Sequence, residues 1–395
     1  MHNELADRQQ AIRLRLAGDS IDSICHTLKR TKPWFHKWWY RYLASGPEGL
    51  YDLTRANRQV VNRTPPHIER AVLSIRRRLA ARATPETRYT LLGAATIRHE
   101  LETLGLSPVP TTRTIERILE RAGLSCPPLQ LAPRLAQTDY PGPQAHATNQ
   151  LHQVDVVGPR YLTGDKTRYY FVVCKDAFDQ AVYLEFVDSR AMDGMITFLI
   201  HAWQLLGLPE AVQFDNGKEF CGWGRWPRSI SRVIRLCVRL GIEPVFIPEG
   251  KPQRNGSVEH FNGWFQPLLL RHCFGTPDEV RHELQQLITT VNEQHVHAQL
   301  GYRTPAQHRR GQRLRKLPLN FTVDSNQLPL AAGKITFIRL VSAQGRISVL
   351  GESLQIGKRL KFQYVKATLY TKTEIVKVYH NGRLAKQLRY KIRKS

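Results

Sequence analysis

Residues 211–217 have the sequence Ala211-Val212-Gln213-Phe214-Asp215-Asn216-Gly217, a short strand-like run that ends in an acidic turn. A second such run, Leu151-His152-Gln153-Val154-Asp155-Val156-Val157, occurs earlier in the chain. A third acidic residue closes the later segment Pro252-Gln253-Arg254-Asn255-Gly256-Ser257-Val258-Glu259. From about residue 255 to 271 the apolar residues recur with a helical period. We therefore expect the first two acids near strand ends and the third on a helix.

The elements expected around these acids follow a defined order. Strands are predicted at 151–157, 168–175 and 181–187, then a helix at 191–206, a strand at 210–214, a helix at 230–240, a strand at 244–247 and the helix at 255–271. The short links between the first three strands predict antiparallel neighbours. The fourth strand would pair with the first. This is the order of a ribonuclease-H-like α/β fold, which would gather the three acids at one site.

Three carboxylates of this kind suit hard divalent cations. Asp155 would bridge two Mg²⁺ ions, with Asp215 completing one ion site and Glu259 the other. Mn²⁺ is an expected substitute. Two such ions support cleavage and rejoining of a phosphodiester backbone without a covalent protein–DNA intermediate. Three other acids lie near the site in sequence: we expect structural roles for Asp176 and Asp179, and a supporting role for Glu219.

The net charge of +25 is unevenly distributed. Residues 1–140 have 22 basic and 13 acidic side chains, a net charge of +9. Residues 141–300 have 15 and 17, a net charge of −2, and residues 301–395 have 21 and 3, a net charge of +18. Two basic ends around a near-neutral centre favour a polyanionic partner such as DNA.

The first 50 residues predict a helix-turn-helix domain. Helices are expected at 5–17, at 21–28 and from Thr31 to about residue 44, with a tight turn before the third. That third helix would be the recognition helix, and it offers Lys32, His36, Lys37 and Arg41 to DNA. The alternative is a plain three-helix bundle whose tryptophans form the core.

A second helix-turn-helix domain is expected at residues 64–125. Its helices would span 66–83, 91–104 and 111–122, with Arg113 and Arg117 as candidate DNA contacts. Residues 126–149, rich in Pro and Ala, would link it to an α/β core at 150–300.

The C-terminal region predicts a small all-β domain. Residues 301–332 would be a basic linker, and residues 333–395 a β-barrel of the SH3-like type. Its strands are expected at 335–340, 346–350, 354–356, 360–364, 367–370, 374–379 and 383–390. The charge favours nonspecific contacts with DNA phosphates. A protein-binding barrel is the rival interpretation.

The remaining composition indicates a cytoplasmic protein. No apolar run approaches the roughly 18 residues that a membrane span needs, and the N-terminus does not resemble a secretory signal. The six cysteines include no Cys-x-x-Cys pair, which favours reduced thiols over a disulfide framework or a zinc site.

Two segments resemble a known family. Asp215-Asn216-Gly217-Lys218-Glu219-Phe220 and the run from Pro252 to Asn262 look like the two signature blocks of retroviral-type integrases and DDE transposases. The segment 300–306 and the helical front resemble bacterial insertion-sequence transposases. The core resemblance covers about residues 145–310.

The resemblance implies a DNA transposase. Such an enzyme would bind the terminal inverted repeats of its element, expose 3′-hydroxyl ends and join them to target DNA. It also implies a dimer or tetramer that acts on double-stranded DNA in a bacterial cell, associated with the nucleoid. An ATPase that selects target sites is a further candidate partner. The alternatives are a DNA-binding regulator with an inactive core and a metal-dependent nuclease of the same fold.

The chain also departs from the family pattern. Asp215 and Glu259 are 44 residues apart, against about 35 in the family, and we place the surplus in the aromatic-basic loop 221–228. That loop would either stack on distorted DNA or be an ordinary surface insertion. The family's lysine positions after the glutamate are Gly263 and Gln266 here. The candidate DNA contacts near the site are instead Lys251, Arg254, Asn255 and Asn262.

Overall fold

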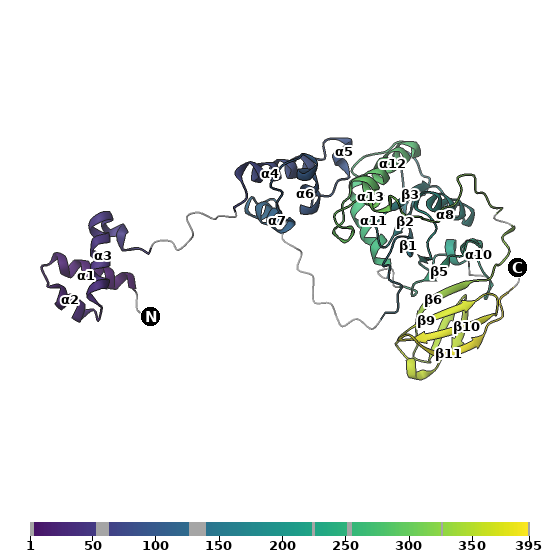
Figure 1. Ribbon diagram of the computed structural model, residues 1–395. Helices are drawn as coiled ribbons and strands as arrows, with labels where there is room; N and C mark the ends of the chain where they lie inside the picture. Colours follow the sequence, from purple (N-terminus) through teal and green to yellow (C-terminus); the bar gives the residue numbers. More distant parts are fainter. Residues whose placement is uncertain are drawn as a thin grey trace. The chain divides into compact units, whose positions relative to one another are not determined.

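The computed structural model describes residues 4–52, 63–125, 140–222, 226–250, 255–324 and 327–393 (Figure 1). Lys251, Arg254 and the middle of the loop 221–228 lie outside the described residues. The chain divides into two compact units, residues 1–63 and residues 64–395.

The first unit is helical. It contains α1 (Glu4–Leu16), α2 (Ile21–Thr27), α3 (Lys32–Ser45) and the 3₁₀ turn η1 (Gly46–Leu50). The Ser20 and Thr31 side chains cap α2 and α3 by accepting from the backbone N–H three residues on, which fixes the tight turn between the helices. Trp38 is 2% exposed, and the Arg8 guanidinium covers its ring. The three predicted helices are therefore present, and α3 has both a core face and an exposed basic face.

The second helical segment begins the second unit. Its helices are α4 (Pro66–Ala81), the short α5 (Pro85–Arg88), α6 (Ala94–Thr103) and α7 (Thr112–Arg121). Apolar residues at helical spacing, among them Val72, Ile97 and Ile115, form one buried cluster. The predicted helices at 66–83, 91–104 and 111–122 correspond to α4, α6 and α7, and α5 was not anticipated.

The residue after α5 joins this helical segment to the central domain. Tyr89 is fully buried in a cluster with residues of the central domain. Its hydroxyl donates to Glu283 Oε1 at 2.7 Å, and Arg88 forms an ion pair with the same carboxylate at 2.5 Å. His295 Nε2 lies 2.7 Å from the Tyr89 carbonyl oxygen. Glu283 belongs to α12 (Pro277–Gln294), a long helix that the sequence analysis did not predict.

The central sheet has the predicted mixed topology. Its strands are β1 (Leu151–Arg160), β2 (Tyr169–Asp176), β3 (Val182–Val187), β4 (Ala211–Phe214) and β5 (Glu243–Phe246). The spatial order is β3-β2-β1-β4-β5. The first three strands pair antiparallel, while β4 lies parallel to both β1 and β5. This arrangement confirms an α/β core of the ribonuclease-H-like type.

Helices cover both faces of this sheet (Figure 1). On β2, Val172 and Cys174 pack into one apolar cluster with α8 (Met192–Leu206) and α10 (Arg232–Arg239). Phe171 and Val173 point to the other cluster, which includes α12 and α11 (Gly256–Leu269). The alternation follows from the two-residue period of a strand, and it makes the central strands apolar on both faces.

The C-terminal strands correct the prediction of a separate barrel. They are β6 (Lys334–Leu340), β7 (Arg346–Val349), β8 (Glu352–Gln355), β9 (Tyr364–Tyr370), β10 (Ile375–His380) and β11 (Arg383–Arg389). β6 pairs parallel with β5, so β6, β9, β10 and β11 extend the central sheet to nine strands (Figure 1). β7 and β8 form a small hairpin of their own. Lys358–Leu360 is a 3₁₀ turn, η5, where a strand at 360–364 was predicted, and β9 continues from Tyr364 as one strand.

The segment 301–332 is also more than a linker. It contains α13 (Pro305–Arg309), and Leu317 and Leu328 are buried in the main core cluster. Arg309 forms ion pairs with Asp176 at 2.9 Å and Asp179 at 2.7 Å, and both carboxylates are fully buried. Those two acids therefore have the structural role that we expected.

Two further observations concern the described residues as a whole. No disulfide links the cysteines among them. No helix within them combines the length and apolar character needed to cross a membrane.

We predict that Tyr89→Ala destabilises the second unit by about 3–5 kcal/mol, because it empties a buried aromatic site and leaves the Glu283 carboxylate without one of its donors. Chemical denaturation of the full chain measures the change. Tyr161→Ala is the matched control, since Tyr161 is 57% exposed, and it should change stability by less than about 0.5 kcal/mol. Equal effects of the two substitutions would contradict the anchoring role of Tyr89.

Candidate active site

Strand register directs Asp155 and Asp215 to adjacent positions, just past the point where the pairing of β1 with β4 ends. Gln153 on β1 pairs with Gln213 on β4, and each aspartate follows its glutamine by two residues. Since side chains alternate along a strand, each aspartate extends from the same face as its glutamine. The pairing with β4 stops at Gln153, whereas β1 continues along β2 to Arg160. Asp155 therefore lies in the middle of β1, not near its end as expected.

The two paired glutamines hold the helix that includes Glu259. Gln153 Oε1 accepts from the Val258 backbone N–H at 3.1 Å. Gln213 Nε2 donates to Asn255 Oδ1 at 3.0 Å, and Asn255 Nδ2 donates to the Val154 carbonyl at 3.1 Å. These bonds fix the start of α11 against β1 and β4. Glu259, in the first turn of α11, is thereby placed over the strand that contains Asp155.

Asp155 receives a direct hydrogen bond from the same helix. Asn262 Nδ2 donates to Asp155 Oδ2 at 2.7 Å, and the Val156 N–H donates to Asp155 Oδ1 at 3.0 Å. The other atom of the Asn262 amide, Oδ1, is buried and has no hydrogen-bond partner within the described residues. An unsatisfied oxygen beside a carboxylate is an acceptor to which a cation or its water can bind.

The turn after β4 is tightly built. The Gly217 N–H donates to Asp215 Oδ1 at 3.0 Å, and Asn216 Nδ2 donates to the Ile247 carbonyl at 2.6 Å. A Cβ at Gly217 would lie 2.7 Å from the Glu219 carboxyl carbon, so a side chain there would displace the Glu219 carboxylate. Glu219, on the short helix α9 (Lys218–Cys221), is therefore packed against the turn.

The pKa values of all three acids are raised, chiefly by burial and, for Asp155 and Glu259, also by neighbouring carboxylates. Burial raises the pKa of Asp155, and the charges of Asp215 and Glu219 raise it further. Burial also raises the pKa of Asp215, against the hydrogen bond from Gly217 and the positive charge of Arg190. Burial and the charge of Asp155 raise the pKa of Glu259. Mutual repulsion of this kind is typical of carboxylates gathered at a functional site.

Arg190 is a cation near these acids that the sequence analysis did not identify. Its Nη1 lies 3.5 Å from Glu219 Oε1, its guanidinium lies over the Tyr170 ring, and its side chain is 51% exposed. A signal was present in the sequence, because Arg190 follows the third strand on the edge where the acids were expected. A lone arginine in a loop is nevertheless not distinguishable from a solvated surface charge.

The residues present fit a hard divalent cation by chemistry. The donors are carboxylate oxygens and one unsatisfied amide oxygen, which are the ligands that Mg²⁺ prefers. The structure does not gather the acids into a closed metal cage: among the described residues, no three His, Cys, Asp or Glu side chains lie close enough to hold an ion.

Comparisons with known proteins point to one family. Residues 145–252 match one family model described as an integrase core domain, and residues 240–305 match a second with the same description. The matched range contains Asp155, Asp215 and Glu259. Residues 145–305 are therefore similar to integrase core domains.

Relatives of the integrase core come from bacterial insertion elements. A 31.7 kDa protein of insertion element IS407 from Burkholderia multivorans is 28% identical over 165 residues, 41% of this chain and 55% of that protein. A 39.2 kDa protein of insertion element IS476 from Xanthomonas euvesicatoria is 31% identical over 102 residues, 26% of this chain and 27% of that protein. The chain thus matches about half the length of the first relative and about a quarter of the second.

Solved structures of viral integrases are also similar. The catalytic core domain of HTLV-2 integrase in complex with magnesium is 23% identical, with 42% of this chain and 99% of that chain covered and a TM-score of 0.33. A simian T-cell lymphotropic virus intasome in complex with PP2A regulatory subunit B56 gamma is 19% identical, with 76% and 97% covered and a TM-score of 0.38. The fold described above rests on its strand order and not on these two scores.

The predicted DNA contacts divide into two groups. Asn255 and Asn262 are 2% and 5% exposed, and their amides bond to the integrase core itself. They position Asp155 and α11, which corrects the expectation that they face DNA. The other described candidates lie on helices outside the core and are at least partly exposed: Lys32, His36, Lys37 and Arg41 on α3, and Arg113 and Arg117 on α7.

The aromatic-basic loop contacts the C-terminal segment. Trp226 is 54% exposed, and the Arg393 guanidinium lies 4.2 Å from its ring centroid. The Arg228 N–H donates to the Leu350 carbonyl at 2.9 Å, and the Arg228 side chain is ion-paired with Glu352. These contacts place the described end of the insertion on the C-terminal strands, and stacking on DNA stays a prediction.

We predict that Asp155→Asn stabilises the protein when divalent ions are absent. A raised carboxyl pKa in the folded state means that its stabilising effect is full below the unfolded pKa, near 3.8, and is lost as the pH rises through the folded pKa. At pH 7 the ionised Asp155 therefore opposes folding. The substitution should raise the Tm by about 2–4 °C, the shift that roughly 1 kcal/mol produces in a domain of this size.

Differential scanning calorimetry with and without MgCl₂ measures this effect. Mg²⁺ should raise the Tm of the wild type more than that of Asp155→Asn. Asp165→Asn is the matched control, because hydrogen bonds involving Thr167 and Tyr169 hold the pKa of Asp165 low and its charge favours folding. A Tm that falls in Asp155→Asn would mean that Asp155 is structural.

Proposed function

We propose that the chain is a DNA transposase that exposes 3′-hydroxyl ends on its element and joins them to target DNA. The observation that supports this proposal best is the register of β1 and β4, which directs Asp155 and Asp215 to one sheet edge within a segment that matches the integrase core. Relatives in two insertion elements favour transposition over other uses of the fold.

Asp155, Asp215 and Glu259 are the proposed catalytic residues. They would hold Mg²⁺, two ions per site, which when bound supplies Lewis-acid stabilisation of charge on the reacting phosphate and an activated hydroxyl. Mn²⁺ is the proposed substitute. Asn262 orients Asp155 through its bond to Oδ2, and Gln153 and Gln213 hold the start of α11.

The basic parts of the chain would provide the grip on DNA. The exposed Lys37 on α3 and Arg113 and Arg117 on α7 would contact phosphates or base edges at the element ends. The proposed partners are double-stranded DNA and further copies of this chain, with an ATPase target selector as a prediction from the family resemblance alone.

The first experiment is a strand-transfer assay. The full chain is incubated with a labelled duplex of the element end, a supercoiled plasmid and Mg²⁺ or Mn²⁺. We expect joined product from the wild type and a loss of at least about 10³-fold in Asp215→Asn, because removing a metal-binding carboxylate removes transition-state stabilisation.

Asp165→Asn, which changes a half-buried acid outside the site, should join DNA at the wild-type rate. Metal-dependent nicking without joining would favour a nuclease of the same fold. Binding without either reaction would favour a DNA-binding regulator with an inactive core.

A second prediction concerns residues 1–63, which form a compact unit of their own. Their deletion should remove the preference for element ends while nonspecific DNA binding by the rest of the chain persists. Residues 64–125 are retained in this variant, because Tyr89 anchors that segment in the central domain. Footprinting on a duplex with one end sequence measures the outcome.

A point substitution tests the same unit more finely. Lys37→Gln on α3 should weaken end binding and reduce the slope of log K against log salt by about 1. Arg13→Gln on α1 removes an equally exposed charge away from α3 and should leave end binding unchanged. An unchanged footprint after the deletion would contradict end recognition by this unit.

A further inference from the structure

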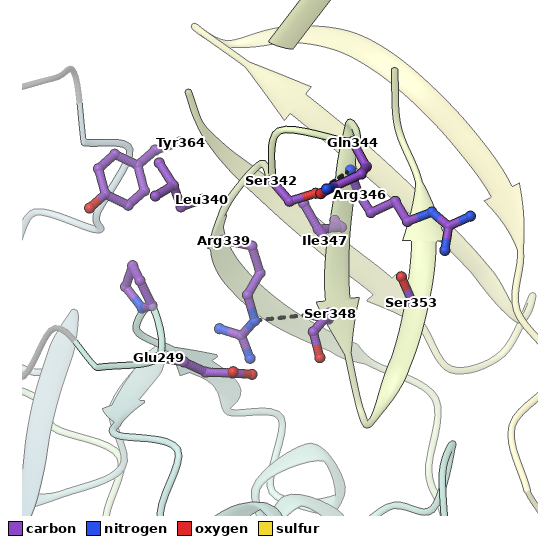
Figure 2. A pocket seen from close by; sticks show the side chains of 11 residues that line it. Glu249, Arg339, Leu340, Ser342, Gln344, Arg346, Ile347, Ser348, Ser353 and Tyr364 are labelled. Atoms are coloured by element: carbon purple, nitrogen blue, oxygen red, sulfur yellow. Dashed lines mark hydrogen bonds between the residues drawn. The ribbon is translucent and has the colours of Figure 1, made fainter. Parts of the chain in front are cut away.

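One buried arginine connects the C-terminal strands to the turn that follows Asp215. Arg339 lies on β6 and is 4% exposed. Figure 2 shows its guanidinium between the β7–β8 hairpin and Glu249, with a hydrogen bond to Ser348. The Nε–H donates to the Ser348 carbonyl at 2.9 Å. Nη1 donates to the Ile247 carbonyl, just beyond β5, also at 2.9 Å.

The remaining nitrogen of Arg339 reaches the candidate active site. Nη2 donates to Asn216 Oδ1 at 2.9 Å, while Asn216 Nδ2 donates to Ile247 O at 2.6 Å. The Asn216 amide is therefore bonded at both ends, once to Arg339 and once to the carbonyl that Arg339 also binds. This closed set of bonds fixes the residue directly after Asp215. The Asp215 carboxylate in turn accepts from the Gly217 N–H on the far side of Asn216.

Burial of this guanidinium away from water costs free energy. Within the described residues no carboxylate lies within ion-pair distance of Arg339, and its hydrogen-bond acceptors are neutral oxygens. Burial lowers the pKa of Arg339 to about 10, with Glu249 acting in the opposite direction. A buried, unpaired cation normally costs several kcal/mol, so its presence points to a positional function.

We propose that Arg339 is a positioning residue of the active site, which holds the Asp215 turn in place through Asn216. The C-terminal strands are then part of the catalytic unit, in addition to any DNA contacts that they make. This inference rests on the proposed function, because it assigns Arg339 to the same reaction.

The same region offers a matched control. A cavity of about 420 Å³ next to Arg339 is lined by Glu249, Ser348, Ser353 and Arg346, among others (Figure 2). Arg346 is exposed and lies on the same hairpin, and its Nε donates to Gln355 Oε1 of the neighbouring strand at 3.0 Å. Its substitution removes one positive charge near the same cavity but no bond to the Asp215 turn.

The test compares Arg339→Met with Arg346→Met in the full chain. Partners that orient metal-binding residues typically contribute about 10–100-fold to activity or metal affinity. We expect Arg339→Met to lower the joining rate at saturating DNA by that factor and to raise the Mn²⁺ concentration for half-maximal rate, with unchanged DNA affinity. Arg346→Met should leave the rate and the Mn²⁺ requirement at wild-type values.

Asn216→Ala provides the second arm of the test. It removes the oxygen that accepts from Arg339 Nη2 and leaves Arg339 itself unchanged. If Arg339 acts through Asn216, the double variant should be no slower than the worse single variant. Additive losses, or a wild-type rate and Mn²⁺ requirement in Arg339→Met, would overturn the proposal. If Arg339→Met does not fold, Asn216→Ala must still show the raised Mn²⁺ requirement, and failure to do so overturns it equally.

The inference can fail separately from the proposed function. Electron paramagnetic resonance can measure the binding of Mn²⁺ to the protein alone. This measurement needs no joining activity. Weaker binding in Arg339→Met and Asn216→Ala than in Arg346→Met supports the positioning role even if the wild type joins no DNA. Equal binding in all three variants contradicts it even if the wild type is an active transposase.

Discussion

The parallel pairing of β1 with β4 is the constraint on which the candidate site depends. The register that sets Gln153 opposite Gln213 also fixes where Asp155 and Asp215 leave the sheet, and a shift by one residue would turn each aspartate to the opposite face. The same two glutamines bind the start of α11, so one register controls all three acids. Val154 of β1 and Val212 of β4 also pack in one apolar cluster with residues of β2 and α8.

Gathering the acids at one site lowers the stability of the folded protein at neutral pH. Burial raises the pKa values of all three carboxylates, and neighbouring acids add to this for Asp155 and Glu259. Hydrogen bonds from Asn262 and from the Gly217 N–H, and the charge of Arg190, act in the opposite direction. None of these groups neutralises Asp155 directly. Asp155 is repelled by nearby carboxylates and receives hydrogen bonds only from neutral groups. Such a carboxylate can bind a cation from solution, which agrees with the oxygen donors found there.

Much of the core was predictable because its signals are local. The strands around Asp155 and Asp215 are short apolar runs between turns, and the antiparallel order of β1, β2 and β3 follows from short links. The missed helix α12 also had a local signal, since Val280, Leu284, Leu287 and Val291 recur at helical spacing. Its many glutamines and its position beyond the last expected acid led us to overlook it.

The remaining differences depend on partners that are distant in sequence. β6 pairs with β5 although 87 residues, 247–333, lie between the end of β5 at Phe246 and the start of β6 at Lys334. No local pattern marks a parallel pairing of this kind. Tyr89 was indistinguishable from a loop aromatic until Glu283 and His295 were placed around it. The sequence therefore predicted which residues form the site better than it predicted which segments support them.

The basic C-terminal region shows most clearly why composition alone misleads. Its charge of +18 predicted a module that grips phosphates, yet Arg309 and Arg339 are committed to the interior. Arg309 forms ion pairs with two buried aspartates, Asp176 at the end of β2 and Asp179 just after it, and Arg339 bonds to the turn after Asp215. Charge counted along a sequence measures what a segment could offer to DNA only after the buried members are removed. Here the two arginines connect the C-terminal region to the catalytic sheet, so the segment that would hold DNA phosphates also supports the residues proposed to act on them.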